Sequence, residues 1–119
     1  MSYTTIPLEY LIQRLIEKGL ESFEALERGD EELQDELAEE TYELGNAIVA
    51  YGKDGANALR PLLDDPREGV QLLGAAWLVK LDPASAVLVL QRLKCDTGGA
   101  TAANAGLALM QARDQGLLS

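Results

Sequence analysis

The sequence predicts an all-α protein of about six helices, and three observations support this prediction. Apolar residues recur every three or four positions along most of the 119-residue chain, as they do on one face of an α-helix. Aromatic residues make up only 5% of the composition, whereas leucine and alanine, which favour helices, are abundant. Glycine residues and Asp-Pro pairs interrupt the pattern where turns between helices are expected. We therefore expect antiparallel helical hairpins packed one after another.

Two long amphipathic helices are predicted in the N-terminal part. The first begins near Pro7, because proline suits the first turn of a helix. It ends at Gly29, a residue that readily adopts the left-handed conformation found after helix ends. Asp30 is a good N-cap for the second helix, which we expect to continue to about Tyr51.

Shorter helices are predicted in the rest of the chain. We expect them at residues 58–63, 67–81, 84–93 and 100–113. The segment Gly52-Lys53-Asp54-Gly55 is interpreted as the turn that precedes them. The helix at 67–81 is apolar around nearly its whole circumference, which is typical of a buried helix. Gly99 and Gly106 are interpreted as sites where the last helix approaches its neighbours closely.

The last two helix pairs are similar in sequence. After about thirty residues, Val70, Gly74 and Ala76 are matched by Ala102, Gly106 and Ala108. Helix–turn–helix units that repeat at this period stack as a solenoid. We expect one domain over residues 1–119, made of an acidic N-terminal hairpin (1–53) and two helix pairs (55–113).

Residues 62–83 resemble the HEAT-repeat signature, which has a leucine pair, an Asp-Pro turn, and then valine, a small-residue pair and leucine. The matching residues are Leu62-Leu63, Asp64-Asp65-Pro66, Val70, Ala75-Ala76 and Leu78, followed by Asp82-Pro83. Gln71 departs from the signature, because many HEAT units carry arginine there, and this puts the usual Arg–Asp ladder between repeats in doubt. Gly98-Gly99 replaces Asp-Pro in the second copy. The resemblance implies a short HEAT-like α-solenoid that serves as a binding scaffold.

The whole chain is also similar to a family of small bacterial proteins of unknown function. The similarity covers most of the sequence but is carried by the order of its helices, two long ones followed by two HEAT-like pairs. It implies no activity.

The net charge of −10 is concentrated in the N-terminal third. Residues 1–44 hold three basic residues against thirteen carboxylates, whereas residues 45–119 hold seven of each. Such a surface repels phosphate backbones and anionic lipid, so nucleic acid and membrane are not expected partners.

The composition argues against catalysis and cofactors. The chain has no histidine, which removes Ser-His-Asp and Cys-His arrangements and nearly all zinc sites. Its single cysteine, Cys95, cannot form an internal disulfide and is expected to be a surface or half-buried thiol in a reducing compartment. Residues 1–5 lack the pattern of a signal peptide. We expect a cytoplasmic protein that is not an enzyme and needs no metal or cofactor.

The leading functional hypothesis is a protein-binding module that docks a basic partner on its second helix. One form of this hypothesis is an immunity protein that neutralises a basic toxin, because charge complementarity would speed encounter and add selectivity. The alternative for the same face is a solvated surface that keeps the protein soluble. The candidate partner-binding residues are Glu32, Asp35, Glu36, Glu39, Glu40 and Glu43.

A structural or homo-oligomeric helical subunit is the other function considered. It would associate through the apolar flank of the first helix or through the C-terminal end, where Gly116-Leu117-Leu118-Ser119 is largely apolar. Three tyrosines, Tyr10, Tyr42 and Tyr51, are expected to be half-buried between helices, and any exposed one would suit an interface. Trp77 is expected to pack in the core.

Overall fold

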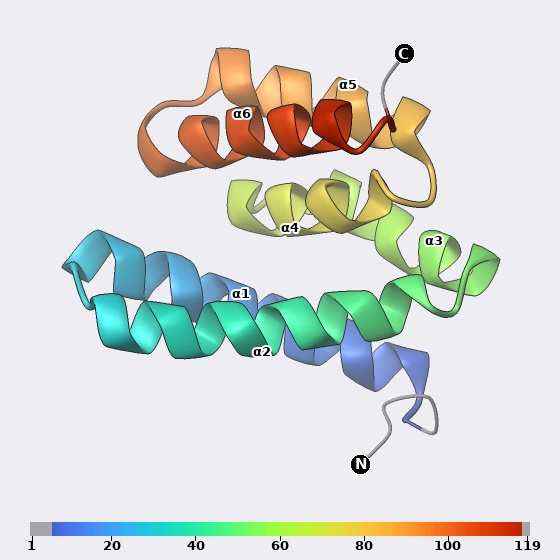
Figure 1. Cartoon of the computed structure of the whole chain (residues 1–119), viewed down its shortest axis with the longest axis horizontal. Coiled ribbons are helices and arrows are strands. Elements are labelled where there is room, and N and C mark those ends of the chain that lie inside the picture. The colour runs from blue at the N-terminus through green and yellow to red at the C-terminus, as the bar shows by residue number, and fades with distance from the viewer. Residues whose placement is uncertain (1–5, 118–119) are drawn as a thin grey trace. The chain divides into compact units, whose positions relative to one another are not determined.

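A computed structural model describes residues 6–117 as helices and turns, with no strand among them (Figure 1). The all-α prediction of about six helices is thereby confirmed. The α-helices are α1 (Leu8–Arg28), α2 (Glu31–Val49), α3 (Lys53–Leu59), α4 (Glu68–Leu78), α5 (Pro83–Asp96) and α6 (Gly99–Asp114), and a 3₁₀ helix, η2 (Arg60–Asp64), follows α3.

The chain forms two compact units that meet at Ala58 and Leu59, and each is described by itself. The expectation of a single domain over residues 1–119 stays a prediction. Residues 1–5, from which no signal peptide is expected, lie outside the described residues. So do Leu118 and Ser119, the last two residues of the largely apolar C-terminal segment.

The N-terminal unit is built on the antiparallel hairpin of α1 and α2 (Figure 1). Gly29 ends α1 with a φ of 75°, and the N–H of Asp30 then donates to the carbonyl of Ala25 at 2.9 Å. The Asp30 carboxylate accepts from the N–H of Leu33 at 3.2 Å and so caps α2, as predicted. Apolar residues of both helices are buried in this unit: Leu11, Leu15, Ala25, Leu37, Leu44 and Ile48.

Tyr51 joins the end of α2 to the start of α1. Its hydroxyl donates to the carbonyl of Ile6 at 2.7 Å, across 45 positions of sequence. The ring is half-buried, as expected from the sequence. The bond satisfies a carbonyl just before α1, where the chain has no helical partner for it.

The connection to the second unit differs from the prediction. Lys53, Asp54 and Gly55 belong to α3 and are not a turn, because the turn consists of Ala50, Tyr51 and Gly52, the last at a φ of 61°. The short helix predicted at 58–63 is found as the 3₁₀ helix η2, Arg60–Asp64, and its first two predicted residues belong to the end of α3. The α-helix ends at Leu59, since Pro61 has no N–H to donate and disfavours the helical conformation of the residue before it. The tighter η2 turn continues the chain.

The second unit packs α4 against η2, α5 and α6, and packs α5 against α6. The sequence predicted α4 as a buried helix, and this is confirmed. After its first two residues, Glu68 and Gly69, every residue of α4 is buried except Gln71, Ala76 and Trp77, which are half-buried. The largest fully buried side chains in this unit are Leu59, Val70, Leu78, Leu90 and Leu93.

Gln71 links two parts of this unit, although its departure from the HEAT signature put such links in doubt. Its side-chain amide donates to the backbone carbonyl of Asp65 at 2.6 Å. Its amide oxygen accepts from the Arg92 guanidinium at 2.7 Å. A glutamine can both donate and accept, so it connects the turn before α4 to α5 without an Arg–Asp pair.

The glycines of α6 do not have the role assigned to them from sequence. A Cβ on Gly106 would lie 3.7 Å from the nearest neighbour, Lys94 Cε, which is ordinary contact. Gly99 has open space around it and is required by its φ of 59° instead. Within the second unit the close approach lies at Gly74 in α4, where a Cβ would be 2.6 Å from Leu62 Cβ.

Asp82 caps α5 and also holds Arg60. Its carboxylate accepts from the Ser85 hydroxyl at 2.8 Å, from the Ser85 N–H at 3.4 Å and from the Arg60 guanidinium at 3.2 Å. The hydrogen bonds from Ser85, followed by the one from Arg60, hold the pKa of Asp82 below its ordinary value of 3.8.

The depressed pKa of Asp82 predicts a pH-dependent contribution to stability. This contribution is complete above the unfolded-state pKa of 3.8 and is lost as the pH falls through the lower folded-state pKa. We expect Asp82→Asn, which can still cap α5, to be less stable than the wild type at pH 6 and equally stable at pH 2. Urea denaturation followed by the fluorescence of Trp77, in the same unit, measures this difference. An equal loss at both pH values would contradict the role of the carboxylate charge.

Candidate protein-binding face

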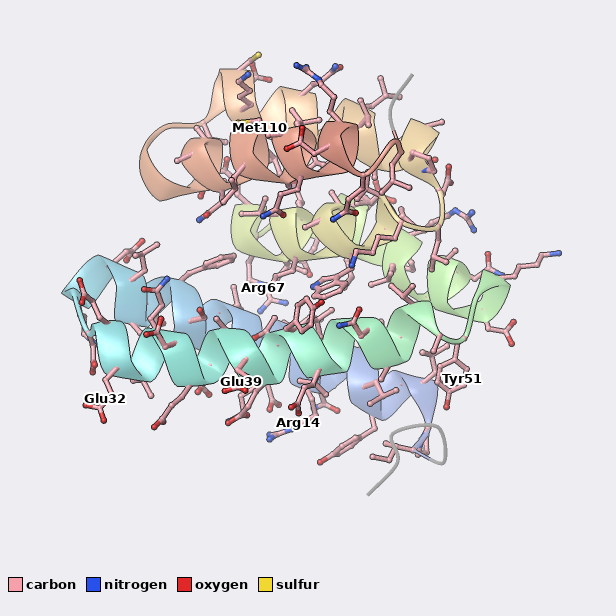
Figure 2. All side chains as sticks on the ribbon, in the orientation of Figure 1. Arg14, Glu32, Glu39, Tyr51, Arg67 and Met110 are labelled. Atoms are coloured by element: carbon pink, nitrogen blue, oxygen red, sulfur yellow. The ribbon has the colours of Figure 1, made fainter. Side chains whose placement is uncertain are left out.

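Six carboxylates of α2 form the candidate binding surface, here called the acidic face. Its residues are Glu32, Asp35, Glu36, Glu39, Glu40 and Glu43, and all six are exposed. Figure 2 shows Glu32 and Glu39 projecting from the same side of α2. At a rise of about 1.5 Å per residue the face extends about 16 Å along the helix. The structure thus brings together, on one helix, all the residues proposed from sequence.

The helix forms in spite of its like charges because other features stabilise it. Leu37, Leu44 and Ile48 are buried on the opposite side. Asp30 caps the first turn, where Glu31 and Glu32 also interact favourably with the helix dipole. Carboxylates four positions apart cost only a few tenths of a kcal/mol per pair. Burial of the apolar side therefore outweighs the repulsion along the acidic face.

One cation of the described N-terminal unit reaches the acidic face. Lys18 on α1 lies 3.7 Å from the Glu40 carboxylate and 4.0 Å from that of Glu21. The Lys18 side chain is only 20% exposed, so it connects the two helices more than it presents charge to solvent. The other five carboxylates of the face make no ion pair within residues 6–117, and their negative charge is not offset locally.

Two tyrosines are more exposed than the sequence suggested. Tyr10 is 51% exposed and Tyr42 is 60% exposed, so the prediction that they are half-buried is wrong. Tyr42 follows Glu39 by three positions on α2, which places it beside the acidic face. Periodicity missed this exposure because tyrosine is compatible with either side of an amphipathic helix. Trp77, expected in the core, is half-buried, with Lys80 Nζ 4.9 Å from its ring centroid.

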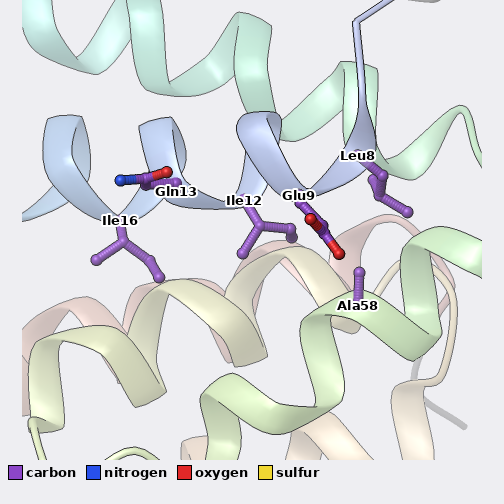
Figure 3. A pocket seen from close by; sticks show the side chains of 6 residues that line it. All are labelled: Leu8, Glu9, Ile12, Gln13, Ile16 and Ala58. Carbon is purple, nitrogen blue, oxygen red and sulfur yellow. The ribbon is translucent and has the colours of Figure 1, made fainter.

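A groove of about 480 Å³ lies along α1 (Figure 3). The side chains of Leu8, Ile12 and Ile16 point from one side of the helix, and Ala58 adds to the lining. Among the described residues that line it, Glu9 is the one ionisable group. A single carboxylate in an apolar groove offers no acid–base pair and no nucleophile with an adjacent base. The groove therefore presents apolar surface and no reactive constellation.

Other features singled out in the sequence are placed as follows. Within residues 6–117, no three Cys, Asp or Glu side chains are arranged to hold a metal ion. Cys95 is exposed near the end of α5. Among the helices that the structure describes, none combines the length and apolar character that crossing a bilayer requires. The predictions that the chain is not an enzyme and acts in the cytoplasm stay predictions.

Comparison with known proteins places the fold but no activity. The crystal structure of the protein RPA1889 from Rhodopseudomonas palustris CGA009 is similar to this chain, with a TM-score of 0.82. The similarity covers 96% of this chain and 94% of that one, at 20% sequence identity. The sequence matches no model of a protein family, and no curated protein is similar to it. The chain thus shares its all-α fold with a bacterial protein.

Proposed function

We propose that this protein is a non-catalytic binding module whose acidic face docks a basic protein. The observation that carries the proposal is the row of exposed carboxylates along α2, of which only Glu40 forms an ion pair within residues 6–117. An exposed row of uncompensated charge attracts an opposite surface over a Debye length of about 8–10 Å at moderate ionic strength. It thereby raises the association rate and selects against acidic partners.

The spacing of the charges favours a partner that otherwise binds nucleic acid. Six charges over about 16 Å correspond to roughly one charge per 3 Å of helix. One strand of double-helical DNA carries one phosphate charge per 3.4 Å. A basic surface that fits a phosphate strand therefore meets a similar charge density on α2. This is the basis for proposing an immunity protein that neutralises a basic toxin, such as a nuclease, in the cytoplasm.

We propose in addition that residues 55–113 are two HEAT-like helix pairs of a short α-solenoid. The support is the Asp-Pro turn before α5, where Asp82 caps the helix, and the bonds of Gln71 to Asp65 and Arg92. In a solenoid each helix pair stacks on the next, as α4 of the first pair does on α5 and α6 of the second. Such a scaffold would present helical surfaces for binding.

Charge reversal on α2 tests the proposed function. Glu36→Lys, Glu39→Lys and Glu43→Lys are combined in one variant, and Glu40 is left intact because it pairs with Lys18. We expect the wild type, immobilised, to retain basic proteins from a bacterial lysate at 50 mM NaCl and to release them at 0.5 M. The variant should retain them at least tenfold less, as quantified by mass spectrometry.

A matched control separates the acidic face from net charge. Glu9→Lys, Glu24→Lys and Glu27→Lys change three exposed carboxylates of α1 by the same amount. We expect this control to retain the same proteins as the wild type, and circular dichroism should show both variants to be helical. Equal retention by the wild type, the α2 variant and the α1 control would show that the acidic face is only solvated.

A further inference from the structure

We draw no further inference here: the strongest candidate, the apolar groove along α1 lined by Leu8, Ile12, Ile16 and Ala58, carries nothing because nothing in the structure shows what covers it.

Discussion

Replacing Leu90 by alanine should lower the free energy of unfolding of the second unit by about 3 kcal/mol. Leu90 is fully buried in α5, a helix that packs against both α4 and α6. Truncation removes apolar contact with its neighbours and leaves a cavity that packed helices cannot fully close. Because residues 59–119 contain the one tryptophan of the chain, Trp77, fluorescence in urea reports on this unit directly.

Leu88 provides the matched control on the same helix. It is the same residue type two positions earlier, but it is 69% exposed. We expect Leu88→Ala to change the free energy of unfolding by less than about 0.5 kcal/mol, as exposed substitutions usually do. Similar losses for Leu88→Ala and Leu90→Ala would contradict the placement of α5.

Alanine should have opposite effects at Gly74 and Gly106, two positions that the repeat in the sequence treats as equivalent. At Gly74 the new Cβ would lie 2.6 Å from Leu62 Cβ, which is attached to the backbone of η2 and cannot move away alone. Overpacking of this kind costs about 1–3 kcal/mol. At Gly106 the nearest atom is Lys94 Cε, at 3.7 Å, at the far end of a flexible side chain.

We expect Gly74→Ala to destabilise the unit by about 1 kcal/mol or more, and Gly106→Ala to stabilise it by about 0.5–1 kcal/mol through helix propensity. Urea denaturation of the two variants, followed by Trp77 fluorescence and circular dichroism, measures both changes. Loss of stability in Gly106→Ala would show that α6 is packed more closely than this structure indicates.

The helices themselves could be predicted from local signals. Gly29 and Asp30 mark the end of α1 and the start of α2 through conformations and hydrogen bonds that involve neighbouring residues only. The acidic face could be predicted for the same reason, because its residues share one helix at fixed spacing. Pro61 also acts locally, but the apolar pattern around it favours one continuous helix at 58–63. In the structure the proline prevails, and the segment is divided between the end of α3 and η2.

Contacts between distant residues could not be predicted. The hydrogen bond of Tyr51 to Ile6 and the two bonds of Gln71 depend on which helix ends meet in space. The pairing of Lys18 with Glu40 has the same origin, and it removes one carboxylate from the uncompensated part of the acidic face.

The sequence by itself determined the all-α class, the long N-terminal hairpin, the buried character of α4 and the concentration of negative charge on α2. These follow from composition and periodicity, which act along a single helix. Only the tertiary structure decided that Gly74 and not Gly106 lies in a tight contact, and that Leu88, Leu107 and Met110 remain exposed. Leucine, glycine and methionine have the same local preferences in both settings. Their roles depend on what packs against them.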